Sequence, residues 1–138
     1  MILFTDKRIP LVDSNILIDY FLSSKNTDKA TKLIDNSVYL IQPVLVETLN
    51  FIKNKSSNFS SFQAAKLILE NPQTFNFLPY VPDFVSESLE IMDKYLSAKL
   101  AFTDCLLLAH AQYYDLKLFS QDQNMQAFPE ASVVNPFE

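Results

Sequence analysis

The chain has 138 residues, of which 49% are apolar, and it carries one cysteine and a formal net charge of −5. This length fits one compact domain, so we expect a single domain over residues 1–138, with residues 1–8 as a loose N-terminal segment. The chain contains no glycine, which excludes glycine-rich phosphate loops and the fingerprint of dinucleotide-binding domains. The single cysteine excludes an internal disulfide and is typical of a reducing compartment.

The chain begins with MILFTDKRIP, where the apolar segment is four residues long and no basic region precedes it, so we predict no signal peptide. No run approaches the ~18 apolar residues that indicate a membrane span. We therefore expect a cytoplasmic protein with no membrane contact. The negative charge disfavours a broad basic surface for nucleic acid, so any nucleic acid would be handled locally, with metal ions or with a partner.

Short apolar runs alternate with amphipathic segments along the chain. The apolar runs predict strands at residues 9–13, 38–41, 74–79, 116–120 and 132–135. The amphipathic segments predict helices at residues 15–23, 27–36, 43–53, 61–70, 82–97 and 103–114. The polar stretch at residues 53–61 predicts a loop between helices. This alternation indicates the α/β class, as a three-layer α/β/α sandwich around a central parallel sheet.

Two acidic residues follow the first two predicted strands. Asp13 ends the first strand, and Glu47 lies about one turn into the helix that begins at Pro43 after the second. Helical side chains tilt toward the N-terminus of their helix, so Glu47 leans toward the edge at which the strand ends. Ligands of such folds bind outside the carboxyl ends of the strands, and both acids are therefore candidates for a site there.

The spacing of Asp104 and Asp122 predicts that they reach the same edge. A helix from Asp104 to about Tyr114 covers about 16 Å at ~1.5 Å per residue. The chain then turns near Asp115, and the five residues of LKLFS return over about 16 Å at ~3.3 Å each. Because the two lengths match, Asp122 returns to the level of Asp104.

Four carboxylates that converge on one edge repel one another, and a divalent cation offsets that cost. Oxygen ligands favour Mg²⁺ or Mn²⁺, and the chain has no histidine or cysteine pairs that would indicate zinc. Such an ion lowers the pKa of a bound water and stabilises negative charge on a phosphate. The pattern therefore favours hydrolysis of a phosphodiester bond.

Each acid also has a purely structural interpretation. Asp13 and Asp104 fit helix caps or first-turn acids, Glu47 fits a solvent-facing position, and Asp122 fits the start of a turn. His110 lies about 240° around the helix from Asp104 and cannot join that site, and we expect Cys105 to pack as a small hydrophobe. We expect solvated positions for Asp19, Asp35, Asp83, Glu87, Glu90 and Asp115.

The segments LVDSN, PVLVETLNF, FTDCLLLAHA and LFSQD together resemble the PIN domain, and the resemblance is strongest to VapC-type toxins. It extends from about Ile9 to Asn135. The resemblance implies an α/β/α sandwich with an acidic cluster that binds Mg²⁺ or Mn²⁺ and hydrolyses RNA. It also implies a homodimer that a VapB-type antitoxin silences, as in type II toxin–antitoxin pairs.

The resemblance carries residue roles over by motif position. It implies that the catalytic acids and metal ligands are Asp13, Glu47, Asp104 and Asp122. It implies that the polar residues supporting them are Ser14, Asn15, Thr103 and Ser120.

The chain departs from a typical nuclease in having no glycine and only one arginine, Arg8. A second hypothesis is therefore a non-catalytic PIN-like interaction module in an RNA-processing assembly. A third is a receiver-like phosphotransfer domain, which also gathers acids at strand ends. That domain needs a lysine at the end of a late strand, and LFSQD ends without one.

Overall fold

A computed structural model describes residues 5–138 of the chain. Within this range, the strands form one sheet with the order β3-β2-β1-β4-β5, in which all neighbouring strands are parallel. The strands are β1 (Leu11–Val12), β2 (Val38–Leu40), β3 (Phe75–Phe77), β4 (Leu118–Phe119) and β5 (Val133–Val134). The order changes direction at β1, which lies in the middle of the sheet.

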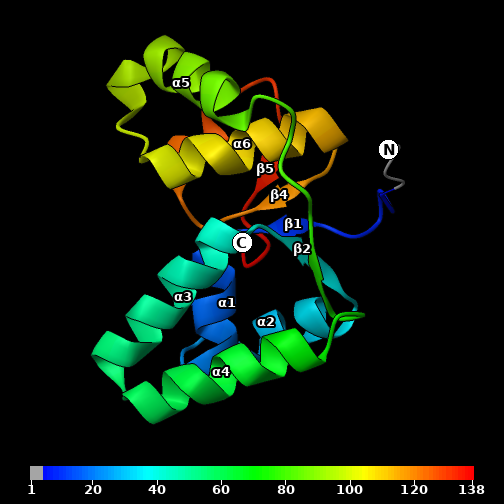
Figure 1. The fold of residues 1–138 in the computed structure, drawn as a ribbon, viewed down its shortest axis with the longest axis vertical. Helices are drawn as coiled ribbons and strands as arrows, with labels where there is room; N and C mark the ends of the chain where they lie inside the picture. Colours follow the sequence, from blue (N-terminus) through cyan, green and yellow to red (C-terminus); the bar gives the residue numbers. More distant parts are fainter. Residues whose placement is uncertain (1–4) are drawn as a thin grey trace.

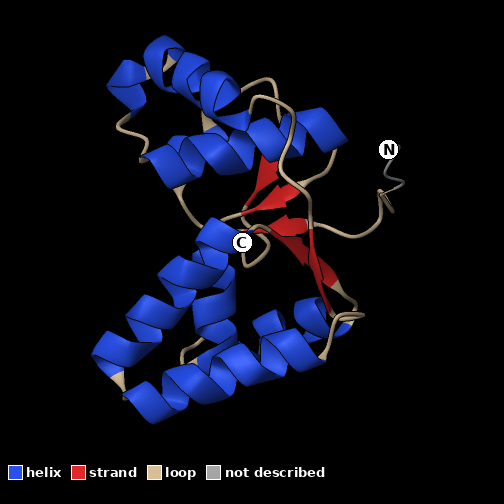
Figure 2. Ribbon diagram, in the orientation of Figure 1, coloured by secondary structure: helices blue, strands red, loops and turns tan. Residues whose placement is uncertain are grey.

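Helices cover both faces of this sheet. They are α1 (Ser14–Phe21), α2 (Thr27–Asp35), α3 (Gln42–Lys55), α4 (Asn58–Glu70), α5 (Phe84–Lys94), α6 (Phe102–Tyr114) and the short α7 (Gln123–Gln126), with a 3₁₀ turn at Leu96–Ala98. Helices α5 and α6 lie on one side of the sheet, and α1 to α4 lie on the other (Figures 1 and 2). This arrangement confirms the predicted α/β/α sandwich around a parallel sheet.

The core lies between the sheet and α6 on one face, and between the sheet and α1 on the other. Leu11, Val12 and Leu118 of the central strands are fully buried. Helix α6 is buried from Cys105 to Ala111, where it packs between α5 and the sheet. Burial of these apolar side chains is the main stabilising contribution to the fold.

The predicted loop at residues 53–61 is wrong. Helix α3 continues to Lys55 and α4 begins at Asn58, so that only Ser56 and Ser57 connect them. The side-chain oxygen of Ser57 accepts a hydrogen bond from the N–H of Ser60 at 3.1 Å, and serine at this position is a favoured N-cap. Polar residues that suggested a loop therefore cap a helix instead.

A chain without glycine must place other residues where the backbone turns left-handed. The residues with positive φ are Ser37, Asp83, Lys99 and Asp115. Asp115 ends α6 at φ 54°, and the N–H of Leu116 donates to the carbonyl of Ala111 at 3.0 Å. Glycine usually occupies this position after a helix, and aspartate is one of the residues that tolerates it.

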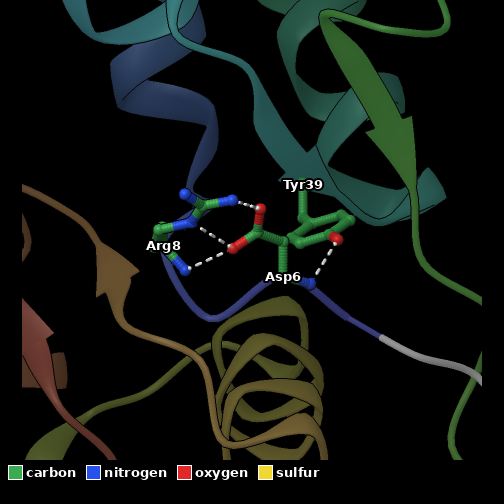
Figure 3. A network of polar contacts seen from close by, with 3 residues as sticks. All are labelled: Asp6, Arg8 and Tyr39. Atoms are coloured by element: carbon green, nitrogen blue, oxygen red, sulfur yellow. Dashed lines mark hydrogen bonds and ion pairs between the residues drawn. The ribbon is translucent and has the colours of Figure 1, made fainter.

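The N-terminal segment is held by contacts from residue 6 onward. The N–H of Asp6 donates to the hydroxyl of Tyr39 at 2.9 Å, and the Asp6 carboxylate pairs with Arg8 (Figure 3). The Lys7 ammonium donates to the carbonyl of Tyr114. The predicted looseness of residues 1–8 falls partly on residues 1–4, which lie outside the described residues. Within residues 5–138, no helix has both the length and the apolar character that crossing a membrane requires.

Candidate active site at the carboxyl edge of the sheet

Three of the four acids predicted from the sequence follow adjacent strands, and the fourth lies at the start of a neighbouring helix. Asp13 directly follows β1, and its N–H donates to the carbonyl of Phe119 in β4 at 3.0 Å. Asp122 comes three residues after the end of β4, Glu47 lies in α3 behind β2, and Asp104 lies in the first turn of α6. Because β2, β1 and β4 are neighbours in a parallel sheet, their carboxyl ends lie at one edge.

The electrostatics of Asp104 link the four carboxylates. Burial, and then the charges of Asp13, Asp122 and Glu47, raise the pKa of Asp104 from 3.8 to about 6, although the N–H of Ala101 lowers it. Like charges disfavour the ionised form only when they are close. Asp13, Asp122 and Glu47 therefore lie within electrostatic reach of Asp104.

Asp13 is the most deeply placed acid, with 4% of its surface exposed. Burial raises the pKa of Asp13, and the charge of Asp122 raises it further. The hydroxyl of Ser120 donates to Asp13 Oδ2 at 2.8 Å and the N–H of Ser14 donates to Oδ1 at 2.7 Å, and both bonds lower that pKa. Asp13 is thus buried with partners, as a carboxylate at such a depth requires.

Ser120 joins the end of β4 to the start of α1. It donates to Asp13, and its oxygen accepts the N–H of Asp122 at 3.0 Å. The Asn15 amide lies 3.4 Å from Ser120 Oγ and 3.5 Å from Asp13 Oδ2, the long end of hydrogen-bonding distance. Two acids and two neutral polar residues therefore form one connected group around the buried Ser120 hydroxyl.

Glu47 and Asp104 are less constrained. Glu47 is exposed, yet partial removal from water and the charge of Asp13 raise its pKa, which the Ser14 side chain partly offsets. Thr103 is half-buried beside Asp104, and within residues 5–138 its hydroxyl makes no hydrogen bond. The structure thus brings Ser14, Asn15 and Ser120 against Asp13, whereas Thr103 lies apart from that group.

Three of the four acids also act as helix caps. Asp104 accepts the N–H of Ala101 at 2.9 Å, Asp122 accepts the N–H of Asn124 at 2.9 Å, and Asp13 is the N-cap of α1. Among residues 5–138, no three acidic, histidine or cysteine side chains lie close enough together to hold a metal ion as they stand. To share a metal ion with Asp13, the carboxylates of Asp104 and Asp122 would have to turn from their caps.

The donor set nevertheless fits a hard divalent cation. All the ionisable donors at this edge are carboxylates, and burial, followed by the charges of neighbouring acids, raises the pKa of Asp104 and of Asp13. The one histidine, His110, is fully buried and its Nδ1 lies 2.6 Å from the carbonyl of Leu106 in the preceding turn of the same helix. Oxygen donors of one charge suit Mg²⁺ or Mn²⁺ rather than zinc.

The sequence did not predict a second polar group beside Asp13. Asp19 was expected at a solvated position, which is wrong: it is half-buried, and its Oδ2 accepts the side-chain amides of Gln121 at 2.9 Å and of Asn26 at 3.2 Å. Asp19 lies one turn after Asn15 on α1, and that spacing was the available signal. As expected, the exposed acids are Asp35, Asp83, Glu87, Glu90 and Asp115.

Comparison with protein families gives one match over most of the chain. The family model described as the PIN domain matches residues 11–131. This range contains all four acids, together with Ser120 and the Asn15 side chain. The comparison with curated protein sequences found no match.

Several solved structures share the fold. A toxin–antitoxin complex from Klebsiella pneumoniae is 26% identical with a TM-score of 0.68, over 94% of this chain and 98% of that chain. VapC20 from Mycobacterium tuberculosis, a sarcin–ricin loop cleaving toxin, is 15% identical with a TM-score of 0.74, over 88% and 97%. VapBC2 from Rickettsia felis, bound to a DNA fragment from its promoter, is 11% identical with a TM-score of 0.71, over 91% and 97%.

Proposed function

Because the chain belongs to the PIN domain family, we propose that it is a Mg²⁺- or Mn²⁺-dependent endoribonuclease and the toxin of a type II toxin–antitoxin pair. This proposal is supported by the position of the four acids at the carboxyl edge of the sheet, where burial and then the charges of the other three raise the pKa of Asp104. The similarity to a sarcin–ricin loop cleaving toxin supports RNA as the substrate class.

Asp13 and Asp104 would hold the metal ion directly, and Glu47 and Asp122 would complete the acidic site. A divalent ion held there lowers the pKa of a bound water and stabilises negative charge on the scissile phosphate. Ser14 and Asn15 lie beside Asp13 and would orient its carboxylate. Ser120, which follows β4, would hold the Oδ2 atom of the same carboxylate. Thr103 would take the equivalent position beside Asp104.

The two proposed metal ligands differ in how firmly the fold holds them. Asp13 is held from two sides by Ser120 and Ser14, so its carboxylate has little freedom to turn. Asp104, with a pKa of about 6, exchanges its proton close to neutral pH while no cation is near. Binding of a cation would therefore release a proton from Asp104 in a fraction of the molecules, and that fraction increases as the pH falls toward 6.

The direct test is cleavage of RNA by the purified chain with Mn²⁺, before and after chelation. We expect cleavage by the unaltered chain and at least about 100-fold slower cleavage by Asp13→Asn and by Asp104→Asn, because loss even of a group that only supports a metal ligand costs 10- to 100-fold. Asp35→Asn, which changes an exposed acid on α2, is the matched control. Unchanged cleavage by both site variants would exclude the assignment.

The proposal includes two protein partners, an antitoxin of the VapB type and a second copy of the chain, in the cytoplasm. The similar structures include toxin–antitoxin assemblies, which supports the first partner. Helices α4 and α5, which lie on opposite sides of the sheet (Figure 1), each carry a row of exposed apolar residues and so supply separate surfaces. One row, on α4, contains Phe59, Phe62 and Leu69. The other, on α5 and the 3₁₀ turn after it, contains Val85, Leu89 and Leu96.

Light scattering tests both partners. We expect the mass of a dimer for the chain alone, and a larger complex after co-expression with the product of an adjoining short gene that has a DNA-binding pattern. A monomer that acquires no partner from its gene neighbourhood would contradict the toxin assignment but not the nuclease activity.

A second candidate function is a non-catalytic interaction module in an RNA-processing assembly. One observation favours it: among residues 5–138, no three acids stand close enough together to hold a metal ion without moving. This function predicts no cleavage with Mn²⁺ and no rise in melting temperature when Mn²⁺ is added. The same two measurements therefore separate the two candidates.

A further inference from the structure

The side chain of Gln121 connects the proposed metal site to α1. Its Nε2 donates to Asp19 Oδ2 at 2.9 Å and lies 3.4 Å from the carbonyl of Asn15. Asn26, at the start of α2, donates to the same Asp19 oxygen at 3.2 Å and lies 3.4 Å from Gln121 Oε1. Asp19, Gln121 and Asn26 therefore form a closed ring of three side chains from α1, the β4–α7 connection and the α1–α2 connection.

This ring continues into the acidic site through the backbone of Gln121. The Gln121 N–H donates to Asn15 Oδ1 at 3.2 Å, which directs the Asn15 amino group toward Asp13 and Ser120. Gln121 also lies between Ser120, whose hydroxyl donates to Asp13, and Asp122. Holding Gln121 against α1 thus fixes residues on both sides of it.

Asp19 is suited to serve as the fixed end of this connection. It is half-buried, and it accepts two amide donors on one oxygen. The ion pairs within residues 5–138 join Asp6 to Arg8 and Lys94 to Glu130, so no cation competes with Gln121 for Asp19. Hydrogen bonds to a charged acceptor are shorter and stronger than those between neutral groups, and the 2.9 Å contact is the shortest in the ring.

We propose that Gln121, anchored by Asp19, is a positioning residue that holds Ser120 and Asp122 against Asp13. The inference rests on the proposed metal-dependent nuclease. Gln121 does not reach the reacting atoms in this assignment, and it acts through the backbone and the side chain of Asn15. Its loss should therefore weaken metal binding and turnover and leave the affinity for RNA unchanged.

Amide exchange tests the connection without using any activity. The N–H groups of Gln121 and Asp122 are bonded to Asn15 Oδ1 and Ser120 Oγ, and NMR can follow their exchange individually. We expect Asp19→Ala to speed exchange of both amides about 10-fold or more. Gln126→Ala, which removes an exposed glutamine from the adjacent α7, is the control and should leave both unchanged. Equal exchange in Asp19→Ala and the unaltered chain would overturn the inference.

Cleavage kinetics of variants at Gln121 and Asp19 test the effect of this connection on activity. Gln121→Glu faces Asp19 with a second carboxylate, and we expect it to lower kcat by about 10- to 100-fold and to raise the Mn²⁺ concentration for half-maximal rate, with KM for RNA unchanged. Adding Asp19→Asn to Gln121→Glu restores one donor and one acceptor with the net charge of the unaltered chain. We expect the double variant to recover most of the lost kcat, which a purely additive effect would not give.

The outcomes separate the two proposals. If the unaltered chain does not cleave RNA with Mn²⁺, the proposed function fails, and the exchange experiment still decides whether Asp19 holds the loop. If the unaltered chain cleaves and Gln121→Glu keeps its kcat and Mn²⁺ dependence, the positioning role fails while the nuclease stands. A fall in kcat that the double variant does not recover also contradicts the role of the Asp19–Gln121 pair.

Discussion

The acidic site consists of two halves that the chain builds differently. The hydrogen-bonded half contains Asp13 and Asp122, which are connected through the buried hydroxyl of Ser120. The helix-borne half contains Glu47 and Asp104, whose carboxylates make no hydrogen bond to Asp13, Asp122 or Ser120 within residues 5–138. Neutral donors thus fix one half in advance, and the charges of the acids, together with the Ser14 side chain beside Glu47, connect it with the other half.

The difference indicates what each half can tolerate. Removal of a donor from the hydrogen-bonded half leaves a buried carboxylate oxygen without its best partner, which is costly. Removal of a charge from the helix-borne half relieves repulsion in the absence of a cation. Substitutions should therefore lower stability in the first half and preserve or raise it in the second, although both lower the activity.

The largest change in stability is expected for Ser120→Ala. It removes the 2.8 Å bond to Asp13 Oδ2, and an unsatisfied buried acceptor costs about 1–3 kcal/mol of unfolding free energy. Cleavage should also slow about 10- to 100-fold, the usual effect of losing a group that orients a metal ligand. Urea unfolding and RNA cleavage measure the two effects.

Thr103→Ala is the matched control because it removes a hydroxyl beside Asp104 in the helix-borne half. We expect a change within about 0.5 kcal/mol, the range of substitutions that break no identified interaction. Equal losses of stability in Ser120→Ala and Thr103→Ala would contradict the distinction between the halves.

An opposite effect on stability is expected for Asp104→Asn. The pKa of Asp104 is about 6 in the folded chain and 3.8 in its reference state, so the folded chain binds more protons between these values. Stability from this group is therefore highest at pH 4 and is lost as the pH rises through 6. A full shift would amount to about 3 kcal/mol, and because Asp104 is only half-buried we expect asparagine to add about 1–2 kcal/mol at pH 7.5.

The pH dependence makes this prediction specific. The advantage of Asp104→Asn should vanish near pH 4, where aspartate is already protonated, and grow as the pH rises to about 7. Urea unfolding of both chains without metal across this range measures it, and Asp93→Asn on the exposed face of α5 serves as the control. If the unaltered chain is the more stable of the two at pH 7.5, burial and the neighbouring acids do not destabilise the Asp104 carboxylate, and the prediction is wrong.

The smallest change in stability is expected for Glu47→Gln. Glu47 is exposed, so we expect the unfolding free energy to change by less than about 0.5 kcal/mol. Cleavage should nevertheless fall, because the site loses one negative charge that would hold the cation. A variant that is as active as the unaltered chain would remove Glu47 from the site and leave the other three acids.

The sequence predicts which acids lie at the sheet edge because the helices and strands that carry them follow from simple periodicities. The apolar run of α6 and the return through β4 are read directly from spacing, and they predict that Asp104 and Asp122 reach one level. The parallel sheet and its two covering layers follow from the alternation of helices with strands. These features depend on backbone rise, which varies little between proteins. The order of the strands in the sheet does not follow from the alternation of helices with strands.

The contacts between side chains could not be predicted in the same way. Gln121 and Asp19 are 102 positions apart, and their meeting depends on the direction in which each side chain leaves its element. Ser57 illustrates a second limit, because a serine that caps a helix and a serine in a loop look alike in sequence. The sequence did offer caps as an alternative role for Asp13 and Asp104, and both acids accept cap hydrogen bonds. The cap that Asp122 forms on α7 was not predicted, because the short α7 was not predicted either.

The central claim is that the two halves close around a divalent cation, and thermal unfolding with added Mn²⁺ tests it most directly. At a Mn²⁺ concentration of 100 times Kd, a single site adds about 2.7 kcal/mol of stability. We expect Mn²⁺ to raise the melting temperature of the unaltered chain and to leave that of Asp104→Asn nearly unchanged. An equal rise in both chains, or no rise in the unaltered chain, would contradict the account.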